Sequence, residues 1–210
     1  MDAGTKPTWD ELRISMRKAQ ILEAAARVFT RKGYHRATTK EIAEEAGVSE
    51  GTIYNYFDSK DALLVSMMGQ LAEAQQLDEK LSEGLNSNAY EFVVAMLRDR
   101  QDFMRRNYTM LLPALSEILV RPKLAERYYQ EVALPVFKVL ERHLEERIAR
   151  GQMRPINVSL AVRIISATVM GLLLLFALGD PLVQSQWDEL AEVMASLLVK
   201  GFEREQTEKA

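Results

Sequence analysis

The sequence contains no cysteine among its 210 residues, which excludes a disulfide framework, a thiolate zinc site and a cysteine nucleophile. It has only two histidines, His35 and His143. A dinuclear metal site in a helical bundle needs repeated Glu-x-x-His pairs on facing helices. Only His143, with Glu146 three residues later, comes near that spacing. No Ser-His-Asp set and no phosphate-binding glycine loop is found, so we predict no catalytic residue, no metal site, no cofactor and no enzymatic activity.

Long hydrophobic runs are also scarce. The first residues, MDAGTKPTWDEL, lack the apolar core of a secretory signal. The most apolar stretch, Ile164 to Leu178, has fifteen residues without a charge, fewer than the roughly 18 that suggest a membrane span. We therefore expect a bundle helix there, no membrane association and a cytoplasmic location.

The net charge of −3 would argue against a nucleic-acid partner if the charge were spread evenly. Residues 13–60 hold nine Lys/Arg and six Asp/Glu, a net charge of +3, so the rest of the chain carries −6. This asymmetry has the sign expected for an amino-terminal segment that meets phosphates. A solvated surface of mixed charge would give the same counts.

The hydrophobic periodicity is helical nearly everywhere, and no segment keeps a strand pattern, so the predicted fold class is all-α. The first helix is predicted from Trp9 to Lys32 and the second from Thr38 to Gly47. Thr8 and Thr38 each precede a Glu by three residues, which is the capping-box pattern.

The remaining boundaries follow from turn residues and prolines. A short third helix is expected near residues 49–57 and a long fourth helix from Ser59. Further helices are expected at residues 89–106, 109–120, 123–150 with a bend at Pro135, 158–178 and 185–202. We place an amino-terminal domain at residues 1–58 and a second domain at residues 59–210.

The third helix is too short to be stable alone, and its internal Gly51 costs about 1 kcal/mol relative to Ala. At 100° per residue, Ile53 and Phe57 share the face that would meet the core. Gly51, Thr52 and Asn55 lie on the opposite face, which is small and polar. This helix therefore needs a partner outside the domain.

A major groove is a suitable partner, because small and hydrogen-bonding side chains would approach the base edges. Tyr54 and Tyr56 flank the core face, and their hydroxyls would reach the two phosphate strands. Two short helices joined by a tight glycine-containing turn are typical of a helix-turn-helix.

Lys60 lies in the first turn of the fourth helix, where the helix dipole disfavours a cation. A phosphate would compensate for this, and a solvated surface lysine is the alternative. The tyrosines could likewise only cover the edges of the core. Together with the turn, the DNA-binding interpretation is preferred.

The segment ILEAAARVFTRKGYHRATTKEIAEEAGVSEGTIYNYFDSKDALL resembles the DNA-binding domain of the TetR family of transcriptional regulators, and the resemblance covers roughly residues 17–65. Several separate motifs agree in order and spacing, including Gly-Thr-Ile-Tyr followed by Tyr-Phe and Ser-Lys. The resemblance implies DNA contacts by Thr39, Lys40, Ser49, Glu50, Gly51, Thr52, Tyr54, Asn55, Tyr56 and Lys60. Glu50 fits least well, because a carboxylate is repelled by DNA unless it accepts from a cytosine amino group.

The resemblance further implies a helical regulatory domain with an internal pocket and a homodimer formed through the last two helices. The helix at residues 158–178 is apolar over more than one stripe, which suits a four-helix dimer interface or burial within a monomer. For the pocket, composition alone suggests a small hydrophobic effector bound by Met67, Phe92, Met96, Phe103, Tyr108, Tyr128, Met170 and Leu174, although such residues are more often ordinary core.

We therefore predict a ligand-responsive transcriptional regulator, a dimeric repressor that binds a palindromic double-stranded DNA operator and is released by its effector. The alternative from another class is a cytoplasmic carrier of hydrophobic molecules without a DNA role. A carrier would show no specific, salt-dependent shift of DNA in a gel.

Overall fold

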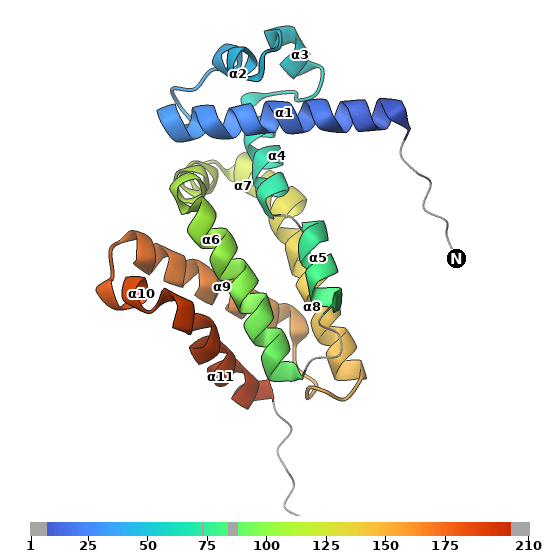
Figure 1. Cartoon of the computed structure of the whole chain (residues 1–210), viewed down its shortest axis with the longest axis vertical. Coiled ribbons are helices and arrows are strands. Elements are labelled where there is room, and N and C mark those ends of the chain that lie inside the picture. Colours follow the sequence, from blue (N-terminus) through green and yellow to red (C-terminus); the bar gives the residue numbers. More distant parts are fainter. Residues whose placement is uncertain (1–7, 73, 84–87, 203–210) are drawn as a thin grey trace, which may run out of the picture. The chain divides into compact units, whose positions relative to one another are not determined.

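The structure is a computed structural model and describes residues 8–72, 74–83 and 88–202 (Figure 1). Every regular element of these residues is helical, which confirms the predicted class. The helices are α1 (Trp9–Lys32), α2 (Thr39–Ala46), α3 (Glu50–Tyr54), α4 (Lys60–Ala72), α5 (Ala74–Glu83), α6 (Ala89–Leu119), α7 (Pro122–Tyr128), α8 (Leu134–Ala149), α9 (Val158–Ala177), α10 (Pro181–Ser185) and α11 (Leu190–Phe202). A π-helical turn at Tyr129–Ala133 joins α7 to α8, and a 3-10 turn at Trp187–Glu189 precedes α11.

These helices form two compact units. Unit 1 contains the described residues up to Ala72 together with Thr109–Val132, and unit 2 contains the other described residues. Unit 1 therefore joins α1 to α4 with the end of α6 and with α7. The predicted boundary after residue 58 follows the helix-turn-helix alone, whereas unit 1 also includes α4, which packs against α1 and α7.

Local sequence signals explain where the first two helices begin and end. Thr8 and Thr38 each form the predicted capping box with the Glu three residues later. Gly47 ends α2 with a φ of 64°, a left-handed conformation that glycine adopts without a Cβ penalty. The predicted limits of α1 are confirmed.

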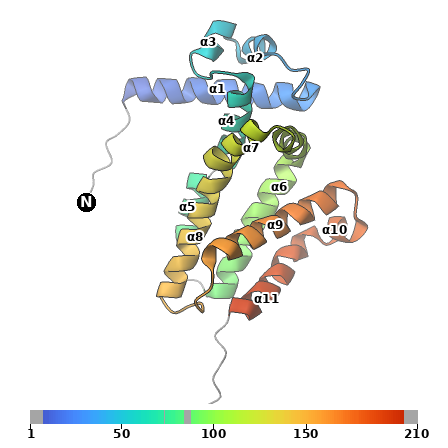
Figure 2. The same ribbon diagram turned by 180° about the vertical axis from the view of Figure 1, so that it is seen from behind.

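The core of the helix-turn-helix is built on α1. The side chains of Ile21, Ile42 and Ile53 are fully buried, and Phe57 is 5% exposed. In both views α2 and α3 lie along one side of α1, and α4 continues from the other side (Figures 1 and 2). One side of the α2–α3 pair is thereby left uncovered within unit 1.

Several predicted boundaries differ from the structure. The break expected near residues 107–108 is wrong, since α6 runs through it, and Asn107 donates its side-chain N–H to the Phe103 carbonyl one turn earlier at 2.8 Å. The long fourth helix predicted from Ser59 is represented by α4 and α5, and residue 73 between them lies outside the described residues, so its continuity stays a prediction. The last helix was expected from Ser185, but Ser185 is the last residue of α10, which Asp180 caps, and α11 begins at Leu190. The helix predicted at residues 123–150 is interrupted by the π-helical turn directly before α8, and the bend at Pro135 stays a prediction.

Unit 2 has one hydrophobic core formed by α5, α6, α8, α9 and α11. α9 contributes only one face, with Val162, Ile165, Val169 and Leu173 buried. Its opposite face exposes Leu160, Ile164, Leu174, Leu175 and Leu178. By length and composition α9 could cross a membrane, and 22% of the relevant window is buried. A single helix of this kind is weak evidence for a span, because helices of soluble proteins pass the same test.

Candidate nucleic-acid interface

The turn between α2 and α3 has the geometry of a helix-turn-helix. Gly47 bends the chain after Ala46, and Ser49 then caps α3 by accepting a hydrogen bond from the Thr52 N–H at 3.2 Å. The two hydroxyls of Ser49 and Thr52 lie 2.8 Å apart and also share a hydrogen bond. Local hydrogen bonds therefore fix the start of α3.

α3 is shorter than predicted, because the chain leaves the helix after Tyr54 and Asn55 forms the C-cap. Its anchoring is as expected: Ile53 is fully buried and Phe57 is 5% exposed. Tyr56 thus lies beyond the helix and is half-buried, so the helical wheel does not describe its direction.

The opposite face of α3 is open. Gly51 and Asn55 are exposed, and a Cβ built on Gly51 would meet only the Ser49 hydroxyl, at 3.9 Å. Tyr54 is 51% exposed. A face this small and polar can approach base edges closely.

A hydrogen-bonded group that the sequence did not reveal joins α2 to α3. Thr39 donates its hydroxyl to Glu50 Oε1 at 2.5 Å and lies 3.2 Å from the Tyr54 hydroxyl. Glu50 therefore has a partner within the protein, which the sequence argument about repulsion from DNA did not include. Residues this far apart along the chain follow no local pattern, so only the folded turn brings them together.

Lys60 has a role that the sequence argument missed. Its ammonium donates to the carbonyls of Tyr34 at 2.9 Å and Ala37 at 3.0 Å, and lies over the Tyr34 ring, 4.3 Å from its centroid. Burial lowers the pKa of Lys60. Lys60 therefore needs no partner outside the protein, because these acceptors in the α1–α2 loop already provide one. A phosphate contact remains a prediction.

The same loop is tied to α4 and α7 by a second charged group. Arg121 donates to Asp61 Oδ1 at 2.7 Å and to the Tyr34 hydroxyl at 3.3 Å, and Tyr34 also donates to Asp61. Burial, followed by the hydrogen bond to Asp61, raises the pKa of Tyr34 to about 12. Burial acts to raise the pKa of Asp61 as well, but the hydrogen bonds from Arg121 and Tyr34 outweigh it and lower that pKa. Unit 1 therefore holds the loop before α2 through a network of charged hydrogen bonds.

Comparison with known proteins identifies this arrangement. Residues 21–67 match the family model of bacterial regulatory proteins of the tetR family. These residues contain both helices of the helix-turn-helix and the start of α4. The chain belongs to the TetR family of transcriptional regulators. It is therefore a DNA-binding regulator from a family that is not enzymatic. The predicted family, the predicted role as a transcriptional regulator and the predicted DNA partner are confirmed.

The similarity to this family extends beyond the DNA-binding helices. The chain is 26% identical over 190 residues to the fatty acid metabolism regulator protein of Bacillus subtilis, covering 87% of this chain and 94% of that protein. It is 30% identical over 154 residues to the HTH-type transcriptional regulator HbdR of Aromatoleum sp., covering 69% of this chain and 63% of HbdR. The crystal structure of FadR from Bacillus subtilis in complex with stearoyl-CoA superposes with a TM-score of 0.70 at 25% identity, covering 88% and 99% of the two chains.

The individual DNA contacts of this TetR-family chain stay predictions. None of the ten residues predicted to contact DNA is buried. The ten are Thr39, Lys40, Ser49, Glu50, Gly51, Thr52, Tyr54, Asn55, Tyr56 and Lys60, all exposed or half-buried in unit 1.

Thr52→Ala and Asn55→Ala are expected to change which operator variants are preferred, because a side chain that reads a base discriminates against the wrong base by about 1–3 kcal/mol. Tyr54→Phe removes a hydroxyl assigned to phosphate, so it should weaken binding to every variant alike. Competition binding against single-base operator variants distinguishes the two effects. An equal loss on every variant for all three substitutions would contradict the base-reading assignment.

The residues predicted for the effector pocket are spread over both units. Met67 and Tyr128 belong to unit 1, and the others belong to unit 2. Met67, Phe92 and Met96 are at most 2% exposed, so in this structure they are core residues. Leu174 is 51% exposed and lies on the outer face of α9, where it does not line an interior pocket of the protomer.

The pocket role of the remaining predicted residues stays a prediction. Tyr108 packs edge-on against Phe176, with the ring centroids 5.6 Å apart, and Phe176 packs against the buried Trp187 at 4.8 Å. Phe103 lies beneath the Arg100 guanidinium, 5.2 Å from it, and Met170 is half-buried. The aromatic row of Tyr108, Phe176 and Trp187 lies within unit 2, and the sequence pattern had indicated only its first member.

Proposed function

We propose that this TetR-family regulator is a homodimeric repressor that binds a palindromic operator and is released by an effector carrying a long acyl chain. The observation that carries the proposal is the open, polar face of α3, opposite the buried Ile53 and Phe57. Two copies of α3 about 34 Å apart would read successive major grooves on one side of the duplex. We place this activity in the cytoplasm, where the DNA is.

The exposed faces of α9 and α11 support the dimer. The α9 face defined by Leu160, Ile164, Leu174, Leu175 and Leu178 is 41–74% exposed in the single chain. Val193 and Leu197 on α11 are 54% and 71% exposed. Gly171 lies on the same face of α9, and a Cβ added there would meet nothing within 4 Å. Apolar surface with a small residue at its centre is suited to close packing against a second copy.

The similarity to FadR supports the class of effector. FadR from Bacillus subtilis was crystallised with stearoyl-CoA, and the likeness covers 88% of this chain, so it includes unit 2. The apolar, methionine-containing core of unit 2 is compatible with an acyl chain. We therefore narrow the predicted small hydrophobic effector to an acyl thioester of coenzyme A.

The effector would act by shifting a population of conformations. An effector that binds more tightly to a dimer whose two α3 helices no longer match the operator reduces DNA affinity by that difference in free energy. The carrier without a DNA role is not favoured, because unit 1 contains the helix-turn-helix of a family of DNA-binding regulators.

A fluorescence anisotropy titration tests the proposal. An operator is first selected from random duplexes, and the affinity is then measured with stearoyl-CoA, with coenzyme A and with stearate. We expect selective binding of the operator over a scrambled duplex, and at least a tenfold loss of affinity with stearoyl-CoA only. Selective binding that none of the three compounds changes would overturn the effector assignment, and the absence of any selected sequence would overturn the regulator proposal.

A further inference from the structure

The first three turns of α1, residues 9–20, contribute nothing to the core. The buried residues of α1 begin at Ile21, whereas Trp9 is 89% and Met16 is 73% exposed. Twelve helical residues extend about 18 Å. In both ribbon views this part of α1 projects past α2 and α3 (Figures 1 and 2). These residues do not pack in the core of unit 1, so their exposed side chains are free to contact another molecule.

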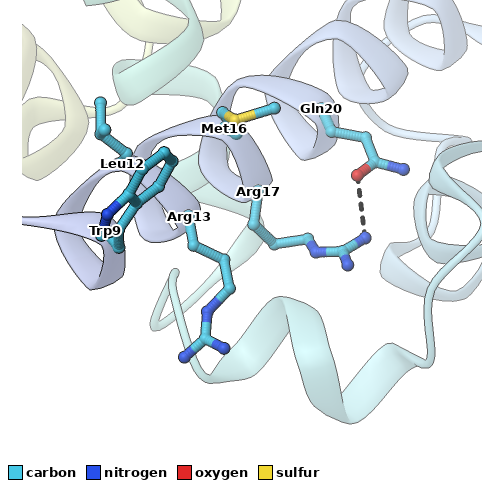
Figure 3. Close-up of a pocket in the computed structure, with 6 residues that line it drawn as sticks. All are labelled: Trp9, Leu12, Arg13, Met16, Arg17 and Gln20. Atoms are coloured by element: carbon cyan, nitrogen blue, oxygen red, sulfur yellow. Dashed lines mark hydrogen bonds between the residues drawn. The ribbon is translucent and has the colours of Figure 1, made fainter.

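One side of this segment is basic. Arg13 and Arg17 are about 40° apart around the helix axis, and their guanidinium groups extend from the same side of α1 (Figure 3). Lys18 is about 100° from Arg17 and about 140° from Arg13, so it lies on another face. Arg13 and Arg17 thus contribute to the net positive charge of residues 13–60.

Hydrogen bonds orient this basic side toward the helix-turn-helix. Arg17 donates from Nη1 to Gln20 Oε1 at 2.8 Å, and Gln20 donates from Nε2 to the Ala46 carbonyl at 2.7 Å. Ala46 is the last residue of α2, three positions before Ser49, the cap of α3. Arg17 is therefore held beside the turn that leads into the recognition helix.

Asp10 lies on the same side, about 20° from Arg17 around the helix axis, so this side carries a net charge of +1. Asp10 pairs with Arg13 at 3.1 Å, but both side chains are about 80% exposed, and such a pair contributes at most about 1 kcal/mol. Glu11 is held by the capping box with Thr8. An exposed pair of this kind exchanges readily for a phosphate.

The groove beside the two arginines is apolar, and Trp9, Leu12 and Met16 form much of its lining (Figure 3). Contacts between proteins and DNA outside the bases combine charged hydrogen bonds to phosphate with contacts to the sugars. The two guanidinium groups can bond to phosphates, and the neighbouring side chains of Trp9 and Met16 can contact the sugars.

We propose that residues 9–20 are a second DNA contact, in which Arg13 and Arg17 bind phosphates in the duplex flanking the segment that α3 reads. The inference rests on the proposed operator binding and extends the footprint. A helix segment of about 18 Å spans about five base-pair steps at 3.4 Å each. This contact adds affinity without sequence preference, because phosphates carry no sequence information.

The test compares Arg13→Ala, Arg17→Ala and the double variant with Lys18→Ala, which removes the same charge from another face. On a selected operator extended by six base pairs at each end, the double variant should lower the slope of log affinity against log salt by about 2 for each protomer. At 0.15 M salt each phosphate contact contributes roughly fivefold, so the loss should be about twenty-five-fold per protomer. Lys18→Ala should change the affinity less than twofold.

The length of the duplex supplies the second measurement. On an operator trimmed to the sequence that α3 reads, wild type and double variant should bind alike. Trp9 is one of two tryptophans, and the other, Trp187, is 4% exposed. Iodide quenching should therefore report Trp9, which the extended duplex protects and the trimmed duplex does not.

Equal salt slopes for wild type and double variant on the extended duplex would overturn the inference while leaving operator binding intact. A loss equal to that of Lys18→Ala would overturn it as well, because the effect would then be general charge. A change in self-association measured by sedimentation, without a change in slope, would assign the groove to a second copy of the chain and overturn the DNA contact. If wild type selects no operator, the proposed function fails and the inference fails with it.

Discussion

Ile164→Glu is expected to leave the chain folded but monomeric, and to lower operator affinity by two to three orders of magnitude. Ile164 is 61% exposed in the single chain, so the substitution disturbs no core. In the proposed dimer it would place an unpaired carboxylate, and its symmetry copy, in an apolar interface. Leaving such a charge buried costs about 3–5 kcal/mol, and every 1.4 kcal/mol is a tenfold change in the equilibrium constant.

Sedimentation velocity measures the association, and anisotropy on the selected operator measures the consequence for DNA binding. Leu119→Glu is the matched control, because Leu119 is 76% exposed on α6 and is not part of the α9–α11 face. The control should remain dimeric. A dimeric Ile164→Glu protein would refute the assignment of this face to the dimer.

Asp61→Asn is expected to lower the free energy of unfolding by about 1–2 kcal/mol at pH 7, because hydrogen bonds to a charged acceptor are replaced by weaker ones. Asp61 accepts from both Arg121 and Tyr34, and partial exposure keeps the cost moderate. Chemical denaturation followed by circular dichroism measures the difference. Tyr34→Phe is the companion variant, since it keeps the pair between Asp61 and Arg121.

The effect of Asp61 should depend on pH in two windows. Because its folded-state pKa is lowered, its contribution is complete above the ordinary aspartate value of about 3.9 and is lost as the pH falls through the folded-state value. Tyr34 has a pKa raised to about 12, so its contribution is complete below about 10 and is lost as the pH rises toward 12.

The difference in stability between wild type and Asp61→Asn should therefore be largest between about pH 4 and pH 10. Above pH 10 the wild type should lose stability faster, because an ionised Tyr34 would face the Asp61 carboxylate. The Tyr34→Phe protein should still lose stability as the pH falls through the folded-state pKa of Asp61, but it should not show the loss above pH 10. A difference that is constant from pH 3 to pH 11 would show that neither group is coupled to folding.

Much of the helix-turn-helix could be predicted because its determinants are local. The capping boxes at Thr8 and Thr38 and the glycine at Gly47 act within one helical turn. The burial of Ile53 follows from helical periodicity, whereas Phe57 is buried although it lies beyond the end of α3. The local signals are readable because each one satisfies backbone groups or covers apolar surface regardless of the rest of the chain.

The prediction for Lys60 shows where local reasoning ends. Its position in the first turn of α4 indicated an anionic partner, but the acceptors are carbonyls more than twenty residues earlier in the chain. The same is true of Leu174: its apolar character was clear, yet only the packing of α9 determines that it faces outward. The break expected in α6 was wrong because the polar side chain of Asn107 can bond to a carbonyl of its own helix.

By itself, the sequence determined the all-helical class, the start of each DNA-binding helix and the family, because capping, turns and periodicity are properties of neighbouring residues. Only the tertiary structure decided that Thr39 holds Glu50, that Arg121 joins Asp61 and Tyr34, and that Gln20 ties Arg17 to the end of α2. Apart from the bond between Arg17 and Gln20 within α1, these contacts join residues that lie on different elements. Their hydrogen bonds form only when folding brings the helices together, so no pattern along the sequence specifies them.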